Sequence, residues 1–257
     1  MARIPAPVAA VRSAVRRALP SGGLTLVACS GGADSLALAA AARFVGSLVG
    51  LVTVDHGLQA GSDQRAAGVA AWARSAGFDP VEVATVEVAG LPGGPEAAAR
   101  SARYAALSAA ADRAGAAAVL LGHTRDDQAE TVLLALARGA GPRGLAGMPF
   151  RKGVFLRPLL DVPRADTRKA CAALGLVPWD DPHNVDPAYA RSRVRGSALP
   201  ALVDALGAGV VGNLARSASM IAADNNALDE LAVAALATAR TAGGLSRSEE
   251  RRVGKEC

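Results

Sequence analysis

The sequence predicts an α/β fold: an open, mostly parallel, doubly wound sheet with a helical extension at its C-terminal end. Two observations support this prediction. Short continuous apolar runs, typical of strands buried on both faces of a parallel sheet, alternate with segments of helical periodicity over residues 24–137. A hydrophobic content of 51% over 257 residues is enough to bury the core that such a sheet requires.

The expected elements follow one another in a regular order. The strands are the continuous apolar runs, and we expect them at residues 24–28, 48–54, 81–88 and 118–122. The helices carry apolar residues three and four positions apart, and we expect them at residues 8–19, 35–44, 62–76, 96–114 and 126–137. Ligands of open parallel sheets bind at the carboxyl ends of the strands. The loops expected to converge there are therefore 29–35, 55–58 and 123–127.

The chain changes character towards its C-terminal end. After Gly139 the pattern loosens into segments containing Gly and Pro, and a long Ala-rich helical stretch follows at 211–240. We expect a main domain over 1–200, a helical linker to a missing region over 201–246, and a foreign tail over 247–257. The tail reads RSEERRVGKEC, and its back-translation resembles a sequencing-library adapter, with a genuine charged helical tail as the alternative.

Charge and composition limit the kinds of partner and the location that we expect. A net charge of +5 suits a polyanion such as nucleic acid, although an ordinary basic surface gives the same value. No apolar run reaches the length of a membrane span, and no signal peptide stands at the start, so we expect a cytoplasmic protein without membrane contact. Cys29, Cys171 and Cys257 are far apart and form no C-x-x-C pair, which predicts neither a disulfide framework nor a cysteine metal site.

A glycine-rich turn joins the first expected strand to the next helix. Glycines permit positive φ and close approach of a ligand, and a helix N-terminus presents free N–H groups to an anion. A carboxylate in such a place requires a cation or a basic neighbour, and Mg²⁺ is the usual cation. A tight turn with a helix N-cap is the alternative reading. The candidate phosphate site comprises Ser30, Gly31, Gly32, Ala33, Asp34 and Ser35, with Asp34 as the candidate metal ligand.

This turn resembles the S-G-G-x-D-S signature of the PP-loop ATP pyrophosphatases. It lacks the lysine of a Walker A loop and the spacing of a dinucleotide-binding loop, so neither of those fingerprints applies. The resemblance implies a fold like that of the adenine nucleotide alpha hydrolases and ATP as co-substrate. It also implies adenylation of a substrate oxygen with release of pyrophosphate, and it leaves the substrate open.

Two further segments carry candidate site residues. In VDHGL, His56 follows the acid that ends the second expected strand, and a capped turn residue is an equal alternative. In the helix expected at 96–114, Glu96, Arg100 and Arg103 lie on neighbouring faces. A solvated, salt-bridged helix surface is the alternative for these three residues.

The segment LGHTRDDQAET places three more candidates at the start of a helix. His123 precedes the helix, and Asp127 and Glu130 share one of its faces because they are three positions apart. Two carboxylates on one face suit an ammonium group or a metal ion. The alternative is that these acids only complement the positive end of the helix dipole.

Taken together, VDHGL, E-x-x-A-R-x-x-R-Y and GHTRDDQAET resemble the tRNA(Ile)-lysidine synthetases in order and spacing. RPLL, WDDPHNVD and YARSRVR extend the likeness, so that it covers roughly residues 24–200. Thr124 stands where the family often has His, and Ser192 where it has Asn, which affects substrate contacts rather than ATP use. The resemblance implies ATP-dependent ligation of L-lysine to C2 of the wobble cytidine of tRNA(Ile) with a CAU anticodon. The expected intermediate is an adenylated cytidine, and the expected products include pyrophosphate and AMP.

The resemblance also implies a role for each candidate. Asp127 and Glu130 are expected to bind the lysine ammonium, and Arg100 or Arg103 its carboxylate or a phosphate of the substrate. His56 and His123 are candidates for nucleotide or base contacts, and a homodimer is left open. The residues expected to meet tRNA phosphates, with solvated surface arginines as the alternative, are Arg191, Arg193 and Arg195.

Two other functions stay open on these grounds. Another PP-loop tRNA-modifying enzyme, one that thiolates its substrate, shares the signature, but such relatives carry cysteines for a metal cluster that this chain lacks. A non-catalytic ATP- or RNA-binding module would keep the fold and lose the acids, whereas Asp34, Asp127 and Glu130 are all present.

Overall fold

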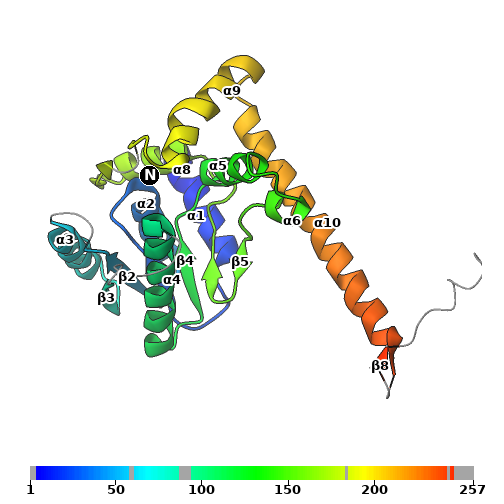
Figure 1. Cartoon of the computed structure of the whole chain (residues 1–257). Helices are drawn as coiled ribbons and strands as arrows, with labels where there is room; N and C mark the ends of the chain where they lie inside the picture. The colour runs from blue at the N-terminus through cyan, green and yellow to red at the C-terminus, as the bar shows by residue number, and fades with distance from the viewer. Residues whose placement is uncertain (1–3, 58–60, 87–93, 183–184, 242–243, 246–257) are drawn as a thin grey trace, which may run out of the picture.

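The computed structural model describes residues 4–57, 61–86, 94–182, 185–241 and 244–245. At its centre lies a six-stranded sheet with the strand order β3-β2-β1-β4-β6-β5 (Figure 1). Neighbouring strands are parallel except for β5, which is antiparallel to β6. The strands are β1 (Thr25–Ala28), β2 (Val49–Asp55), β3 (Val81–Thr85), β4 (Ala118–Leu121), β5 (Arg151–Lys152) and β6 (Phe155–Leu156).

Helices connect the strands and continue beyond the sheet. Those that belong to the sheet domain are α1 (Ala6–Ala18), α2 (Ala33–Val45), α3 (Ser62–Ser75), α4 (Gly94–Ala114), α5 (Arg125–Leu136), α6 (Pro142–Leu145) and α7 (Arg164–Ala173). The later elements are α8 (Ala190–Arg193), a π-helical turn (Val194–Ala198), α9 (Leu199–Leu206), α10 (Val210–Ala239) and a small hairpin of β7 (Arg240–Thr241) and β8 (Gly244–Leu245).

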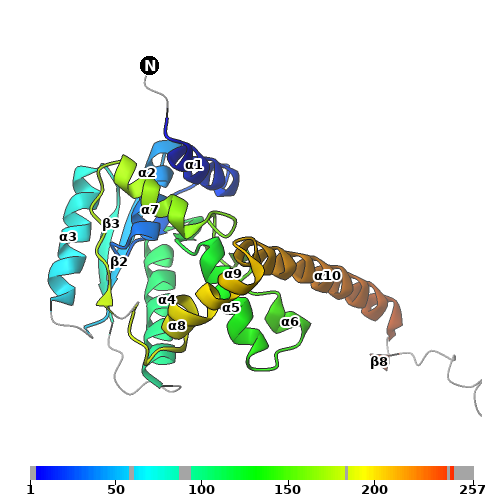
Figure 2. The ribbon, with the colours of Figure 1, turned by 90° about the horizontal axis from the view of Figure 1, so that it is seen from above.

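Both faces of the sheet are buried under helices. Successive residues of a strand point to opposite faces, so Val27 and Leu120 pack with α1, α2 and α7, whereas Leu26 and Val119 pack with α4. Figure 2 shows α1, α2 and α7 on one side of the strands and α4 on the other. The predicted doubly wound, mostly parallel sheet is therefore confirmed.

Gly50 in β2 is required by close packing, and Gly50→Ala is expected to lower the free energy of unfolding by about 1–3 kcal/mol. A Cβ there would lie 2.7 Å from Leu26 Cδ2 and 2.7 Å from the Pro80 carbonyl oxygen. That oxygen accepts a hydrogen bond from Leu51 N at 2.8 Å, so the backbone is not free to retreat. Urea denaturation measures the change.

The matched control is Gly68→Ala. Gly68 is exposed in α3, and a Cβ there meets nothing within 4 Å. This substitution is expected to stabilise the protein by about 0.5–1 kcal/mol, because alanine loses less backbone entropy than glycine in a helix. Equal unfolding midpoints for the two variants would contradict the packing argument.

The segment after Gly139 contains structure that the sequence pattern did not predict. β5 and β6 have two residues each, too few for a period of apolar residues to be recognised. Helix α7 begins directly after Pro163 and buries Ala170 and Cys171 against the sheet domain. This helix brings new side chains to the site described below.

The C-terminal helices leave the sheet domain. The long helix expected at 211–240 is α10, which projects away from the sheet in Figure 1. Its first half packs against α5 and buries Ala215 and Ala218, and further along Arg143 of α6 donates two hydrogen bonds to Asp229, at 3.0 and 2.6 Å. The foreign tail expected at 247–257 lies outside the described residues.

Within the described residues, no single helix is both long and apolar enough to cross a membrane. By length and composition alone, one bent pair passes the same test, Ala190–Leu206 followed by Val210–Ala239 at an angle of 100°.

Candidate active site

The S-G-G-A-D-S loop connects the carboxyl end of β1 to the N-terminus of α2. Gly31 has φ +85°, and a Cβ there would lie 3.0 Å from Val69 Cγ2, so both the backbone conformation and the space require glycine. Helix α2 begins at Ala33, two residues before the expected start, and no side chain caps its first turn. The free N–H groups of that turn are the kind of donors that bind a phosphate.

Two serine hydroxyls lie together inside the loop. Ser35 donates to the Gly32 carbonyl at 2.9 Å and accepts from Ser30 N at 3.2 Å. The hydroxyl of Ser30 lies 3.4 Å from that of Ser35, but Ser30 is exposed whereas Ser35 is buried. Ser35 therefore holds the shape of the loop, and Ser30 is the serine that faces an incoming ligand.

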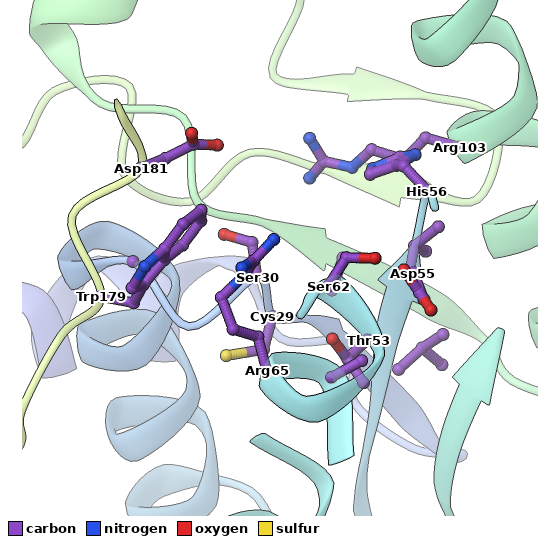
Figure 3. Close-up of a pocket in the computed structure, with 15 residues that line it drawn as sticks. Cys29, Ser30, Thr53, Asp55, His56, Ser62, Arg65, Arg103, Trp179 and Asp181 are labelled. Atoms are coloured by element: carbon purple, nitrogen blue, oxygen red, sulfur yellow. The ribbon is translucent and has the colours of Figure 1, made fainter. Parts of the chain in front are cut away.

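A cavity of about 330 Å³ opens beside this loop, at the carboxyl ends of β1 and β2. Figure 3 shows His56 and Arg103 on one side of it and Trp179 and Asp181 on the other. Arg65 and Ser62 of α3 also line the cavity. Parallel strands direct their carboxyl ends to one edge of the sheet, which explains why residues so distant in sequence meet here.

Trp179 packs beside the S-G-G-A-D-S loop and contacts its backbone. Its backbone N–H donates to the Gly31 carbonyl at 3.0 Å, and its ring lies under the guanidinium of Arg65, at 4.2 Å from the ring centroid. A cation at this distance over an indole is attracted to the ring face. The segment around Trp179 thus fixes one peptide of the phosphate loop and presents an aromatic face to the cavity.

Of the two arginines expected from α4, only Arg103 lines the cavity. Burial lowers its pKa, although it stays a cation at neutral pH. Arg100 is exposed, and its guanidinium lies 5.1 Å from the centroid of the Tyr104 ring. The structure therefore distinguishes between two arginines that the sequence left equivalent.

Both histidines of the site are neutral at physiological pH. Burial, followed by the positive charge of Arg103, lowers the pKa of His56. Burial is also the main cause for His123, whose pKa falls to about 3 although Asp127 acts in the opposite direction. The Nδ1 atoms of both side chains are buried without a hydrogen-bond partner. A neutral imidazole offers one donor and one acceptor, so His56, which lines the cavity, can make polar contacts to a ligand, whereas His123 is not among the lining residues that the structure describes.

Asp127 completes the N-terminal cap of α5. Its Oδ2 accepts from Thr124 N and Thr124 Oγ1, both at 2.8 Å, and the Thr124 hydroxyl accepts from Asp127 N at 3.4 Å, which is a capping box. The other oxygen, Oδ1, accepts from Arg164 at 2.8 Å and from Arg195 at 3.3 Å. Burial raises the pKa of Asp127, but Arg164 and the hydrogen bonds from Thr124 outweigh it and lower the pKa overall.

Glu130 lies one helical turn further and has no exposed surface. Its Oε1 accepts from Arg164 Nη1 at 2.9 Å and from Arg195 Nε at 2.8 Å, and its Oε2 accepts from Arg195 Nη2 at 3.1 Å. Arg191 Nε lies 3.6 Å from the same Oε2. A buried carboxylate is stable only when paired in this way.

Asp34 connects the phosphate loop to this cluster. Its Oδ1 accepts a hydrogen bond from the Thr167 hydroxyl, and its Oδ2 lies 3.7 Å from Arg164 Nε. Burial raises its pKa more than these two contacts lower it, and the negative charge of Asp127 adds to the rise. The sequence required a cation or a basic neighbour for Asp34, and the structure provides Arg164.

The three arginines expected at tRNA phosphates do not form one exposed stripe. Arg191 and Arg195 lie against Glu130, as described, and Arg191 also donates to Thr131 Oγ1 at 3.0 Å. Arg193 is exposed and donates to the carbonyls of Pro187 and Ala188, at 2.7 and 2.9 Å.

Several residues of the site were missed from the sequence. Trp179 and Asp181 belong to the WDDPHNVD segment, which signalled a resemblance but no role. Arg164 and Thr167 follow RPLL in a segment without clear periodicity, and a Pro before a run with Asp in its first turn was the available helix-start signal.

Comparison with known proteins shows the family to which this sequence belongs. Residues 12–202 match the family model of the PP-loop domain. The sequence is 66% identical to the tRNA(Ile)-lysidine synthase of Salinispora arenicola, over 92% of this chain and 74% of that protein. The chain belongs to the tRNA(Ile)-lysidine synthase family. The synthase of Thermobifida fusca, with 62% identity over 88% of this chain and 71% of that protein, agrees with this assignment.

A solved structure outside the lysidine synthase family has the same fold. A U34-tRNA thiolase from Methanococcus maripaludis matches with a TM-score of 0.67 and 18% identity, over 84% of this chain and 79% of that one. At this identity the likeness concerns the fold alone. The identities with lysidine synthases, rather than this match, decide between ligation and thiolation.

Proposed function

We propose that this protein uses ATP to ligate L-lysine to C2 of the wobble cytidine of tRNA(Ile) with a CAU anticodon. The cytidine C2 oxygen attacks the α-phosphate of ATP and pyrophosphate leaves; the lysine amine then attacks C2 and AMP leaves. The observation that supports this most directly is the contact of Asp34, in the phosphate loop, with the Arg164 that also binds Asp127 and Glu130. A phosphate site and a two-carboxylate site thus share one edge of the sheet.

The phosphates of ATP bind the loop, and its nucleoside enters the neighbouring cavity. The first turn of α2, the Ser30 hydroxyl and the glycine backbone supply the donors to the phosphates. Trp179 offers a face for the base, and the neutral His56 offers one donor and one acceptor. Arg103 contributes the positive charge on this side.

Mg²⁺ fits Asp34 as a shared ligand. This ion usually takes one or two carboxylates together with substrate phosphates rather than a cage of protein ligands. Asp34 is a partly exposed carboxylate in the loop, and no cluster of three or more metal-binding side chains occurs among the residues that the structure describes. When bound, the ion neutralises charge on the leaving pyrophosphate.

The lysine ammonium binds Asp127 and Glu130, whose carboxylates already hold cationic groups of similar size. Arg103 is proposed to meet the lysine carboxylate or the α-phosphate, and its position in the lining of the cavity supports this role. Arg191, Arg193 and Arg195 are proposed to approach tRNA phosphates, a contribution that weakens as salt rises. In these roles Arg191 and Arg195 exchange Glu130 for phosphates when the tRNA binds.

We further propose a division into a catalytic domain over 1–200 and a linker over 201–246 that is helical up to the β7–β8 hairpin. The end of the PP-loop family match at residue 202 supports this boundary.

A homodimer is proposed as well, supported by large apolar side chains that α10 leaves exposed. These are Met220, Leu228, Leu231, Val233 and Leu236. Sedimentation velocity at micromolar concentrations tests it, and a monomer would overturn this part of the proposal.

The direct test of the function supplies purified protein with ATP, Mg²⁺, radiolabelled lysine and unmodified tRNA(Ile) with a CAU anticodon. Pyrophosphate release and incorporation of label into the tRNA are expected together. Release without incorporation would keep ATP use and overturn the assignment of lysine. The absence of both pyrophosphate release and incorporation of label would overturn the enzymatic function and favour a binding module.

ATP binding is expected to change the fluorescence of Trp179. The chain has two tryptophans, so Trp72→Phe leaves Trp179 as the single reporter at the cavity. A saturable change in emission on addition of ATP is expected, because the base or the displaced Arg65 alters the environment of the ring. Trp179→Phe is the matched control: it leaves Trp72, which packs against Phe78. A response from Trp72 alone would contradict the placement of the nucleoside.

A further inference from the structure

Arg164 contacts three carboxylates at once. Its Nη1 lies 2.9 Å from Glu130 Oε1, its Nη2 2.8 Å from Asp127 Oδ1, and its Nε 3.7 Å from Asp34 Oδ2. Each nitrogen of the guanidinium therefore faces a different acid. One of these acids belongs to the phosphate loop, and the other two form the site proposed for the lysine ammonium.

The backbone around Arg164 is held firmly in place. Arg164 N donates to Asp126 Oδ2 at 2.8 Å, and the Thr167 hydroxyl, one turn later in α7, lies within hydrogen-bond distance of both Arg164 O and Asp34 Oδ1, which share its single hydrogen. Arg125 N donates to Val162 O at 3.0 Å on the same side. The start of α7 is thus joined to the starts of α5 and α2, so a movement of Arg164 is a movement of its side chain.

Each oxygen of the two carboxylates proposed for lysine accepts at least one hydrogen bond in this arrangement. Asp127 uses Oδ2 for the helix cap and Oδ1 for Arg164 and Arg195. Glu130 accepts from Arg164 and Arg195 and has no exposed surface. An ammonium group can bind here only if a guanidinium leaves, and a half-buried guanidinium leaves only for another anion.

The phosphates of ATP are that anion. Asp34, which Arg164 already contacts, stands in the first turn of α2, beside the free N–H groups that bind phosphate. A guanidinium pairs with phosphate oxygens as well as with carboxylates, through two parallel hydrogen bonds. A change in the side-chain conformation of Arg164, with its backbone held in place, would exchange the carboxylates for the phosphates as partners of the guanidinium.

We propose that Arg164 is a positioning residue that makes lysine binding depend on ATP. Without nucleotide it occupies Asp127 Oδ1 and Glu130 Oε1, and with nucleotide it turns to the phosphates and leaves its place between these two oxygens to the lysine ammonium, while Arg195 stays on the same carboxylates. This inference rests on the proposed placement of ATP and lysine. Because the coupling is reciprocal, lysine strengthens nucleotide binding by the same factor.

Calorimetric titration of the protein with lysine tests the coupling, with and without a non-hydrolysable ATP analogue and Mg²⁺, in the absence of tRNA. The wild type is expected to bind lysine at least about fivefold more tightly with the analogue. Equal affinity in the two titrations would overturn the proposal, whatever the variants do.

Three variants assign the coupling to Arg164. In Arg164→Gln the competing cation is gone, so lysine affinity without nucleotide is expected to rise and the ratio of the two affinities to fall towards one. Arg164→Lys retains the charge and loses the forked pairing, and we expect an intermediate ratio that remains measurable if Arg164→Gln does not fold. Lys169→Gln, at an exposed position of the same helix, is the matched control and should keep the wild-type ratio. A loss of lysine affinity by the same factor in both titrations of Arg164→Gln would indicate a merely structural role and overturn the proposal.

The lysine site itself is tested separately. In Glu130→Gln with the analogue bound, lysine affinity is expected to fall. If it does not fall, the proposed lysine site is wrong. If it falls while the wild type shows no coupling, the site stands and only the role of Arg164 is overturned.

Discussion

Asp34→Asn is expected to reduce pyrophosphate release by a factor of about 10²–10³ while the protein stays folded. The carboxylate is the candidate Mg²⁺ ligand, and the amide that replaces it carries no charge with which to hold the ion beside the leaving pyrophosphate. The rate of pyrophosphate release at saturating ATP and tRNA measures the loss. Activity within a factor of about three of the wild type would exclude Asp34 from the chemistry.

The same substitution is expected to leave stability intact or raise it at neutral pH. Burial raises the folded-state pKa of Asp34 above its unfolded value, so the folded protein binds this proton more tightly than the unfolded chain does. The stability that this provides is complete below the ordinary aspartate pKa of about 3.9 and is lost as the pH rises through the raised pKa. At neutral pH the folded protein therefore bears the cost of a buried charge, which Asn removes.

Asp63→Asn is the matched control for this prediction. Asp63 occupies the first turn of α3 as Asp34 occupies that of α2, but its side chain is exposed. Both variants lose the favourable interaction with the helix dipole, and only Asp34→Asn also gains from the removal of a buried charge. Thermal unfolding at neutral pH is expected to give Asp34→Asn the higher midpoint of the two, and the reverse order would contradict the burial argument.

The sheet and the phosphate loop could be predicted because their signals are local. Continuous apolar runs predicted β1, β2 and β4 to within one residue at each end, since strands buried on both faces consist mostly of apolar residues. The glycines of the loop are needed for φ and for close approach, and both needs can be read from the residue type alone.

The partners of the acids could not be predicted, because they come from far along the chain. Arg164 lies 34 residues from Glu130, and Thr167 lies 133 residues from Asp34. Neither belongs to a segment with a strong apolar period, and their approach to the acids depends on how α7 packs against α1 and α2. The sequence left Asp127 between a ligand residue and an acid that only complements the helix dipole, and it did not predict that one oxygen of Asp127 caps α5 while the other accepts from arginines.

Glu130→Ala is expected to have the largest effect on stability, a loss of about 3–5 kcal/mol in the free energy of unfolding. The substitution removes the fully buried carboxylate that Arg164, Arg191 and Arg195 share. These guanidinium groups would remain partly desolvated with Asp127 and Asp34 as their remaining acids, and an uncompensated buried charge costs more than an exposed one. Urea denaturation of the variant and the wild type, fitted with one m-value for both, measures the loss in the free energy of unfolding.

Two comparisons separate this electrostatic effect from simple truncation. Glu230→Ala, at an exposed position of α10, should change stability by no more than about 0.5 kcal/mol. The double variant Glu130→Ala with Arg195→Ala should lose less than the sum of the two single losses, because removing both partners leaves fewer unpaired charges. If the losses simply add, Glu130 stabilises the site by filling space rather than by pairing arginines, and an exchange of cations at this carboxylate would lose its physical basis.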